Sequence, residues 1–176
     1  MISFKEGDTV VYPGHGAAKI SRIIKKDIAG IGHSFYELKF LRESAVILVA
    51  TQNAKKVGLR HPSNKDVVKV VLKTISTSLK YEDHSVRSWS KRNKKYQGYI
   101  KSGSLFDIAQ IYSDLGFVSK KRTLFFSEKR ILNLVERLLS EEVSMSYEIE
   151  PAIALEEIRQ LCYSYKDLAY FESKYQ

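Results

Sequence analysis

The chain has 176 residues, 44% of them hydrophobic, and can therefore bury one sizeable core or two small ones. It has no apolar run near the roughly 20 residues of a membrane-spanning helix and no apolar signal segment at its start. Its one cysteine excludes an internal disulfide. We therefore expect a cytoplasmic protein with no membrane partner. Its net charge of +9 favours a polyanionic partner, although a soluble basic protein without one would have the same composition.

The first sixty residues are predicted to form short strands separated by glycine turns. Runs rich in β-branched and aromatic residues indicate the strands, and glycine or proline interrupts them. The predicted strands are residues 9–12, 18–28, 35–40 and 45–49, and the main turns are residues 13–16 and 30–32. Such a series predicts a small, strongly bent antiparallel sheet or barrel.

A helix is predicted next, from about Asn64 to the Ser-Thr-Ser cluster at 76–78, because valine and isoleucine recur near helical spacing. We place this helix in the connection between two domains. The expected organisation is a β domain over residues 1–62, a connecting segment over 63–84 and a basic helical domain over 85–176. The predicted fold class is α+β.

Four further helices are predicted in the helical domain. They cover residues 85–101, residues 104–116, a segment from about 127 onward, and a segment from Pro151 onward. Ser104 with Asp107 is typical of a capping box, and Gly116 is expected to end the second of these helices. Pro151 is a favoured first-turn residue. Short loops between amphipathic helices predict a compact bundle.

No pattern in the sequence indicates an active site. Gly14-His15-Gly16 lacks the Gly-Lys-Ser/Thr of a phosphate-binding loop and is better explained as a hairpin turn. The four histidines have no ligand spacing, and Cys162 falls on an apolar helical stripe typical of a buried structural thiol. We therefore expect no enzyme activity, no catalytic or metal-binding residue, no cofactor and no small-molecule substrate.

Residues 87–101 stand out because they contain six basic residues, no acidic residue and the only tryptophan. Basic side chains neutralise phosphates, and aromatic rings stack on bases or wedge between base steps. Lys129 and Arg130, near the start of the helix predicted from about residue 127, could extend the same surface. The candidate DNA-binding residues are Arg87, Trp89, Lys91, Arg92, Lys94, Lys95, Lys129 and Arg130.

The spacing of Trp89 also permits a structural role. Trp89, Asn93, Tyr96 and Ile100 recur every three to four residues, as expected of a helix face that packs in a core. On this pattern alone a core tryptophan is favoured over a nucleic-acid contact. The bases are the better evidence for a polyanion, because like charges without an acid nearby repel each other unless an anion is present.

Both halves of the sequence resemble the CarD (CdnL) family of bacterial transcription regulators. The first half carries the resemblance in FKEGDTVVYP at 4–13, GHGA at 14–17, IAG at 28–30, NA at 53–54 and VGLR at 57–60. The second half carries it in WSKR at 89–92, SG at 102–103, DL at 114–115 and SEKRIL at 127–132. The order and spacing of these motifs over about residues 2–143 carry the similarity, rather than any single motif.

The resemblance implies a Tudor-like β-barrel that binds the β subunit of RNA polymerase, a module shared with the transcription-repair coupling factor. It also implies a helical domain that contacts double-stranded promoter DNA near the upstream edge of the transcription bubble. The tryptophan matching Trp89 is implied to wedge into the minor groove there, which favours the DNA role over the core role. The implied DNA-facing bases match Lys91, Arg92, Lys94 and Lys129, whereas Arg87, Lys95 and Arg130 rest on charge alone.

The expected polymerase contacts are Lys26, Val46, Ile47 and Leu48. Lys26 keeps the basic character of one polymerase-facing position of the family. Two positions depart from the family pattern, since Leu48 stands in place of an arginine and Ala50 in place of a proline. Both departures fall in or next to the strand that is expected to contact polymerase.

We therefore expect a non-enzymatic, nucleoid-associated transcription regulator that stabilises the open promoter complex. The alternatives are a nucleoid protein or nucleic-acid chaperone that acts without polymerase, and a protein-interaction scaffold with no nucleic-acid partner. Residues 141–176, with eight acidic and three basic side chains, leave the resemblance at about residue 143. This acidic segment is expected either to shield the basic face or to bind another partner.

Overall fold

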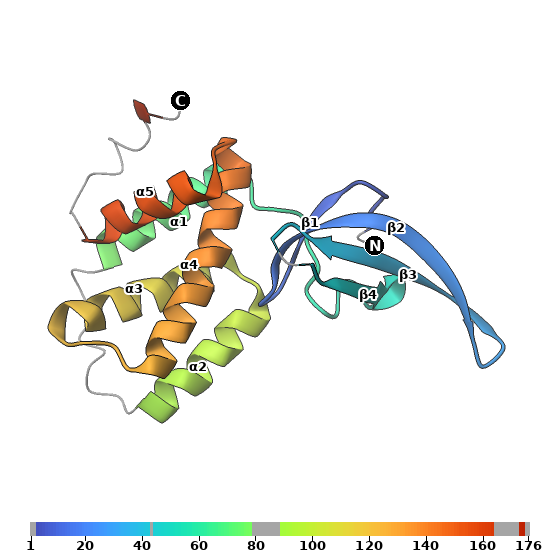
Figure 1. The fold of residues 1–176 in the computed structure, drawn as a ribbon, viewed down its shortest axis with the longest axis horizontal. Coiled ribbons are helices and arrows are strands. Elements are labelled where there is room, and N and C mark those ends of the chain that lie inside the picture. The colour runs from blue at the N-terminus through green and yellow to red at the C-terminus, as the bar shows by residue number, and fades with distance from the viewer. Residues whose placement is uncertain (1–2, 43, 79–88, 164–172, 175–176) are drawn as a thin grey trace. The chain divides into compact units, whose positions relative to one another are not determined.

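The computed structural model describes residues 3–42, 44–78, 89–163 and 173–174. The chain divides into two compact units, one ending at Pro62 and the other beginning at Ser63 (Figure 1). The described part of the first unit consists of strands and one short 3-10 helix, and that of the second consists of α-helices. The predicted α+β fold class is confirmed.

The β unit is a curled antiparallel sheet with the strand order β1-β2-β3-β4. Its elements are β1 (Thr9–Tyr12), β2 (Gly16–Ile28), β3 (Ile31–Phe40), β4 (Val46–Ala50) and the 3-10 helix η1 (Thr51–Asn53). One face of the sheet buries a core that includes Phe4, Val10, Ile20, Leu38 and Leu59. Arg60 exchanges backbone hydrogen bonds of 2.8 and 3.2 Å with Val11, so the chain returns to the outer edge of β1. The result is the expected Tudor-like fold in the form of a half-barrel.

Strands β2 and β3 extend beyond the rest of the sheet as a hairpin arm (Figure 1). Within the described sheet, β1 pairs with β2 only as far as Lys19, and β4 pairs with β3 only from Phe35 onward. The arm ends in a two-residue turn that needs positive φ angles, which Ala29 (55°) and Gly30 (79°) adopt. The Asp27 carboxylate accepts a 2.8 Å hydrogen bond from the Gly30 N–H and closes the turn.

The helices of the second unit pack around one hydrophobic core. They are α1 (Lys65–Ser78), α2 (Trp89–Ser102), α3 (Leu105–Lys121), α4 (Phe126–Tyr147) and α5 (Pro151–Tyr163). Each helix contributes buried side chains, among them Val71, Tyr96, Tyr112, Leu139 and Ile158. The Ser104 hydroxyl accepts a hydrogen bond from the backbone N–H of Asp107 at 3.4 Å, which confirms the predicted cap of α3.

Two details of the helices differ from the sequence-based expectation. The sequence places α1 in a connecting segment, but Val68, Val71 and Ile75 are fully buried in the helical core, so α1 is part of the bundle. Gly116 does not end α3, which continues to Lys121. Glycine costs about 1 kcal/mol relative to alanine inside a helix. Because Gly116 is buried and Val118 beyond it packs inside the unit, tertiary packing outweighs that cost.

Candidate nucleic-acid interface

Trp89 lies at the start of α2 with its indole partly buried. The ring packs against the helical core and meets the ring of Tyr96 nearly edge-on, with the two centroids 6.4 Å apart. Tyr96 itself is fully buried. Trp89, Tyr96 and Ile100 therefore pack together in or against the core, as their spacing predicts, but part of the indole lies outside the core.

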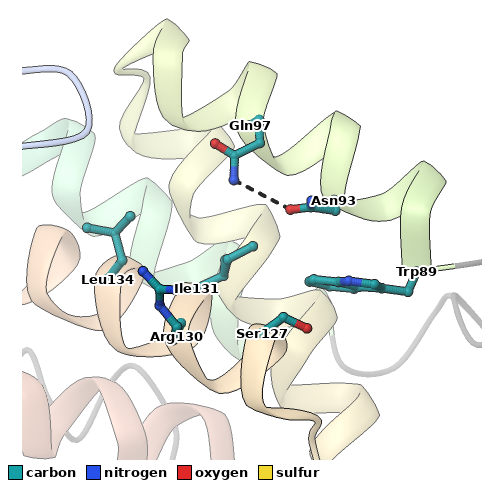
Figure 2. Close-up of a pocket in the computed structure, with 7 residues that line it drawn as sticks. All are labelled: Trp89, Asn93, Gln97, Ser127, Arg130, Ile131 and Leu134. Carbon is teal, nitrogen blue, oxygen red and sulfur yellow. Dashed lines mark hydrogen bonds between the residues drawn. The ribbon is translucent and has the colours of Figure 1, made fainter.

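The outer part of the indole lines an open pocket of about 460 Å³ between α2 and α4. The lining residues are Trp89, Asn93, Gln97, Ser127, Arg130, Ile131 and Leu134. Figure 2 shows the indole reaching across this pocket, with Asn93 on one side and Ser127 on the other. The Gln97 amide donates a 3.4 Å hydrogen bond to the Asn93 side chain. The pocket therefore combines an aromatic ring, amide groups and a cation, a mixture suited to a flat polar ligand such as a nucleobase.

Arg92 faces the interior, although the sequence suggests it as a DNA contact. Its side chain is only 7% exposed, and its Nη2 donates a 2.9 Å hydrogen bond to Glu128, which is fully buried. The guanidinium carbon also lies 5.7 Å from the centre of the Trp89 ring. Arg92 thus connects α2 to the start of α4 and supports Trp89 from inside, and the structure does not place it among the exposed cations.

Glu128 is the centre of this buried ion-pair network. Its carboxylate accepts two 2.8 Å hydrogen bonds from Arg122 and one of 2.9 Å from the backbone N–H of Phe125, in addition to that from Arg92. Burial raises the pKa of Glu128, but the hydrogen bonds and the positive charges of Arg122 and Arg92 outweigh burial and hold the pKa below its ordinary value. The carboxylate is therefore charged at neutral pH, and its ion pair with Arg92 links the start of α4 to α2.

The exposed candidates are Lys91, Lys94, Lys129 and Arg130. The first two project from α2, and the other two from the first turns of α4, where Arg130 also lines the pocket beside Trp89. Lys95 is partly buried, with its Nζ 5.1 Å from the centre of the Tyr99 ring. Arg87 lies outside the described residues. The structure thus brings Trp89 and Arg130 together directly and leaves three lysines exposed on the same two helices.

The basic group at the end of α3 takes part in contacts inside the unit. Lys120 donates a 3.1 Å hydrogen bond to the carbonyl oxygen of Cys162, and Lys121 lies 4.4 Å from the centre of the Phe117 ring. Cys162 is 1% exposed, and burial raises the pKa of its thiol to about 11, so the predicted buried thiol is confirmed. Both lysines make contacts within the helical unit, which a count of charges along the sequence does not reveal.

In the β unit, the residues expected to contact polymerase fall on opposite faces of β4. Val46 and Leu48 are exposed, at 52% and 39%, and lie opposite Lys39 and Glu37 of β3. Ile47 lies opposite Leu38 and packs against the core of the β unit. Because side chains alternate along a strand, Val46 and Leu48 lie on the exposed face of β4, and Ile47 lies on the face toward the core. Lys26 is exposed on the hairpin arm, where it pairs with His33.

Sequence reasoning missed the amide groups of the pocket and the partner of Arg92. Trp89, Asn93 and Gln97 are spaced by four residues, so that one stripe of α2 contains an aromatic ring and two amides. This spacing was a usable signal. Glu128 carried no comparable signal, because its partner Arg92 is 36 residues away in the sequence.

The described residues contain no group of three or more His, Cys, Asp or Glu side chains placed to hold a metal ion. Among the same residues, the helices are all too short or too polar to cross a membrane.

Comparisons with known proteins match both units. The model of the CarD-like/TRCF RID domain matches residues 4–62, and the model of the CarD C-terminal domain matches residues 71–159. A protein of Bacillus subtilis (strain 168) named "Putative transcription factor YdeB" is 27% identical over 139 residues, which cover 78% of this chain and 89% of that protein. The C-terminal model alone spans half of the chain, and the resemblance seen in the sequence is confirmed. The chain belongs to the CarD family of transcription factors.

Proposed function

We propose that this chain stabilises the open promoter complex by binding the β subunit of RNA polymerase through its β unit and promoter DNA through its helical unit. Trp89 is the wedge at the upstream edge of the transcription bubble. The observation that carries the proposal is the partly exposed indole of Trp89, which is supported by a buried core on one side and lines an open pocket on the other.

The physical role of the indole is to favour distorted DNA over regular duplex. Stacking of one base on an aromatic ring is worth about 1–3 kcal/mol. A partly unpaired junction offers an exposed base face, whereas regular duplex offers only base edges, so the wedge stabilises the open state by its differential affinity. Because Tyr96 and Arg92 support the ring, little side-chain freedom is lost on binding.

The exposed bases supply the electrostatic part of DNA binding. Lys91, Lys94, Lys129 and Arg130 are the four exposed candidates, whereas Arg92 is paired with Glu128. If all four contact phosphates, the slope of log K against log salt concentration is about −3.6, at about −0.9 per phosphate. Binding of this kind carries no sequence information and needs a second interaction to bring the protein to promoters.

The edge strand β4 is the proposed contact with polymerase. It is the last strand of the sheet, and an edge strand can pair with a strand of another protein. Val46 and Leu48 would add apolar contacts, and Lys26 a positive charge on the arm. Tethering to polymerase raises the local concentration of the weak DNA-binding surface, so little intrinsic sequence specificity is needed.

Open-complex half-life with purified polymerase and promoter DNA tests the wedge. Trp89→Ala is expected to shorten the half-life about ten-fold, which corresponds to about 1.4 kcal/mol, while Trp89→Phe retains part of the effect. Circular dichroism must show that Trp89→Ala is folded, because the ring also packs against the core. A folded Trp89→Ala protein with the wild-type half-life would remove Trp89 from the mechanism.

Capture of the polymerase β subunit by the immobilised full-length chain tests the other contact. Leu48→Glu places a charge on the exposed face of β4 and is expected to abolish capture. Leu41→Glu is the matched control, because Leu41 is 55% exposed and lies outside β4. If the wild-type chain binds DNA but captures no β subunit, the chain acts as a polymerase-independent nucleoid protein instead.

A further inference from the structure

Two consecutive phenylalanines at the start of α4 are unusually exposed. Phe125 is 61% exposed and Phe126 is 79% exposed. The backbone that carries them is fixed, because the Phe125 N–H donates to Glu128 and the Phe125 carbonyl accepts a hydrogen bond from the Lys129 N–H, both at 2.9 Å. The two rings are therefore held outward by an ordered helix start. Two adjacent exposed aromatic rings form a candidate interaction site.

Basic residues flank the two phenylalanines along the chain. The Arg122 guanidinium carbon lies 4.5 Å from the centre of the Phe125 ring. Lys129 and Arg130 are exposed and follow Phe126 by three and four residues, so they project from the same face of α4. The only acidic residue in segment 120–130 is Glu128, which is buried and paired with two arginines. The exposed surface is thus aromatic and positively charged, and we name the set of Phe125, Phe126, Lys129 and Arg130 the Phe surface.

The Phe surface adjoins the Trp89 pocket. Ser127, the residue after Phe126, lines this pocket together with Arg130, which also belongs to the Phe surface (Figure 2). A ligand that leaves the pocket along the start of α4 therefore meets exposed phenyl rings and cations next.

We infer that the Phe surface binds the unpaired strand of melted DNA as a second contact beside Trp89. This inference rests on the proposed function, because it takes the ligand of the Trp89 pocket to be nucleic acid. Phenyl rings stack on unpaired bases without sequence preference, and Lys129 and Arg130 neutralise the phosphates between them. A fully paired duplex keeps its base faces stacked, so it would meet the cations but not the rings.

The test is an anisotropy titration of the full-length chain with two labelled DNAs of equal length. One is fully paired, and the other contains a central stretch of unpaired bases. The double variant Phe125→Ala/Phe126→Ala is expected to bind the partly unpaired DNA about ten-fold more weakly, equivalent to about 1.4 kcal/mol, and to bind the paired DNA within two-fold of wild type. The variant Phe125→Tyr/Phe126→Tyr keeps both rings and is expected to retain wild-type affinity for both DNAs.

Phe106→Ala is the matched control, because Phe106 is 45% exposed at the start of α3 and is not part of the Phe surface. It should leave both affinities unchanged. Suppose that Trp89→Ala binds the partly unpaired DNA more weakly than wild type does, while the double alanine variant binds it with wild-type affinity. The Phe surface inference is then overturned, and the proposed function stands. If wild type binds neither DNA, both are overturned.

Two further outcomes also overturn the inference. An equal loss of affinity for both DNAs, accompanied by a lower Tm, would show that the rings support the fold. Wild-type binding to phosphatidylserine vesicles that the double alanine variant loses, with DNA affinities unchanged, would assign the Phe surface to an anionic membrane.

Discussion

Replacement of Glu128 by glutamine is expected to destabilise the helical unit strongly. The carboxylate is fully buried and receives hydrogen bonds from Arg92, Arg122 and the Phe125 N–H. The amide of glutamine can still accept the hydrogen bond of the Phe125 N–H. The substitution removes the negative charge, however, and leaves the buried guanidinium of Arg92 without an ionic partner.

The magnitude follows from the exposure of the two arginines. Arg92 is 7% exposed, and breaking a buried ion pair by removing one partner costs about 3–5 kcal/mol. Arg122 is 38% exposed, so water can solvate it after the change, and its pair with Glu128 contributes about 1 kcal/mol or less. We therefore expect Glu128→Gln to lower the free energy of unfolding by about 3–5 kcal/mol.

Urea denaturation monitored by circular dichroism measures this loss, and Arg122→Gln is the matched control with a loss of about 1 kcal/mol. The double variant Arg92→Gln/Glu128→Gln removes both buried charges and should be more stable than Glu128→Gln alone. A loss below about 1 kcal/mol for Glu128→Gln would refute the reasoning, because it would mean that Arg92 is not held by this pair.

Three other predictions concern the same fold. The pKa of Glu128 is lowered in the folded state, so the contribution of its charge to the free energy of unfolding is complete above its unfolded pKa of about 4.3 and is lost as pH falls through the lower folded value. The difference in urea midpoint between wild type and Glu128→Gln should therefore hold from neutral pH to about pH 5 and shrink in more acidic buffer. A difference that stays constant with pH would contradict this prediction. Cys162 is buried with its pKa raised to about 11, so a disulfide reagent at neutral pH should label it quickly only after unfolding. Gly30→Ala should destabilise the chain by about 1–2 kcal/mol in thermal unfolding because its φ is +79°, whereas Gly32→Ala, in open space without positive φ, should be near neutral.

The sequence by itself determined the order and type of the elements, because local patterns carry that information. Runs rich in β-branched and aromatic residues predicted β1 to β4, glycine turns predicted the β1–β2 and β2–β3 connections, and helical spacing predicted all five helices. The exposed lysines of α2 and the basic start of α4 were also visible as runs of charge. Each of these signals lies within about one turn or one strand of the chain.

Only the tertiary structure decided which side chains are exposed to solvent and which are buried. Arg92 and Lys94 are both bases of one helix, but Arg92 is buried because Glu128, distant in the sequence, lies opposite it. The spacing of Trp89 alone favours a core role, and only the fold shows that the ring both packs against the core and lines a pocket beside α4. Charge and hydrophobicity are properties of single residues, whereas burial and pairing depend on segments that only folding brings together.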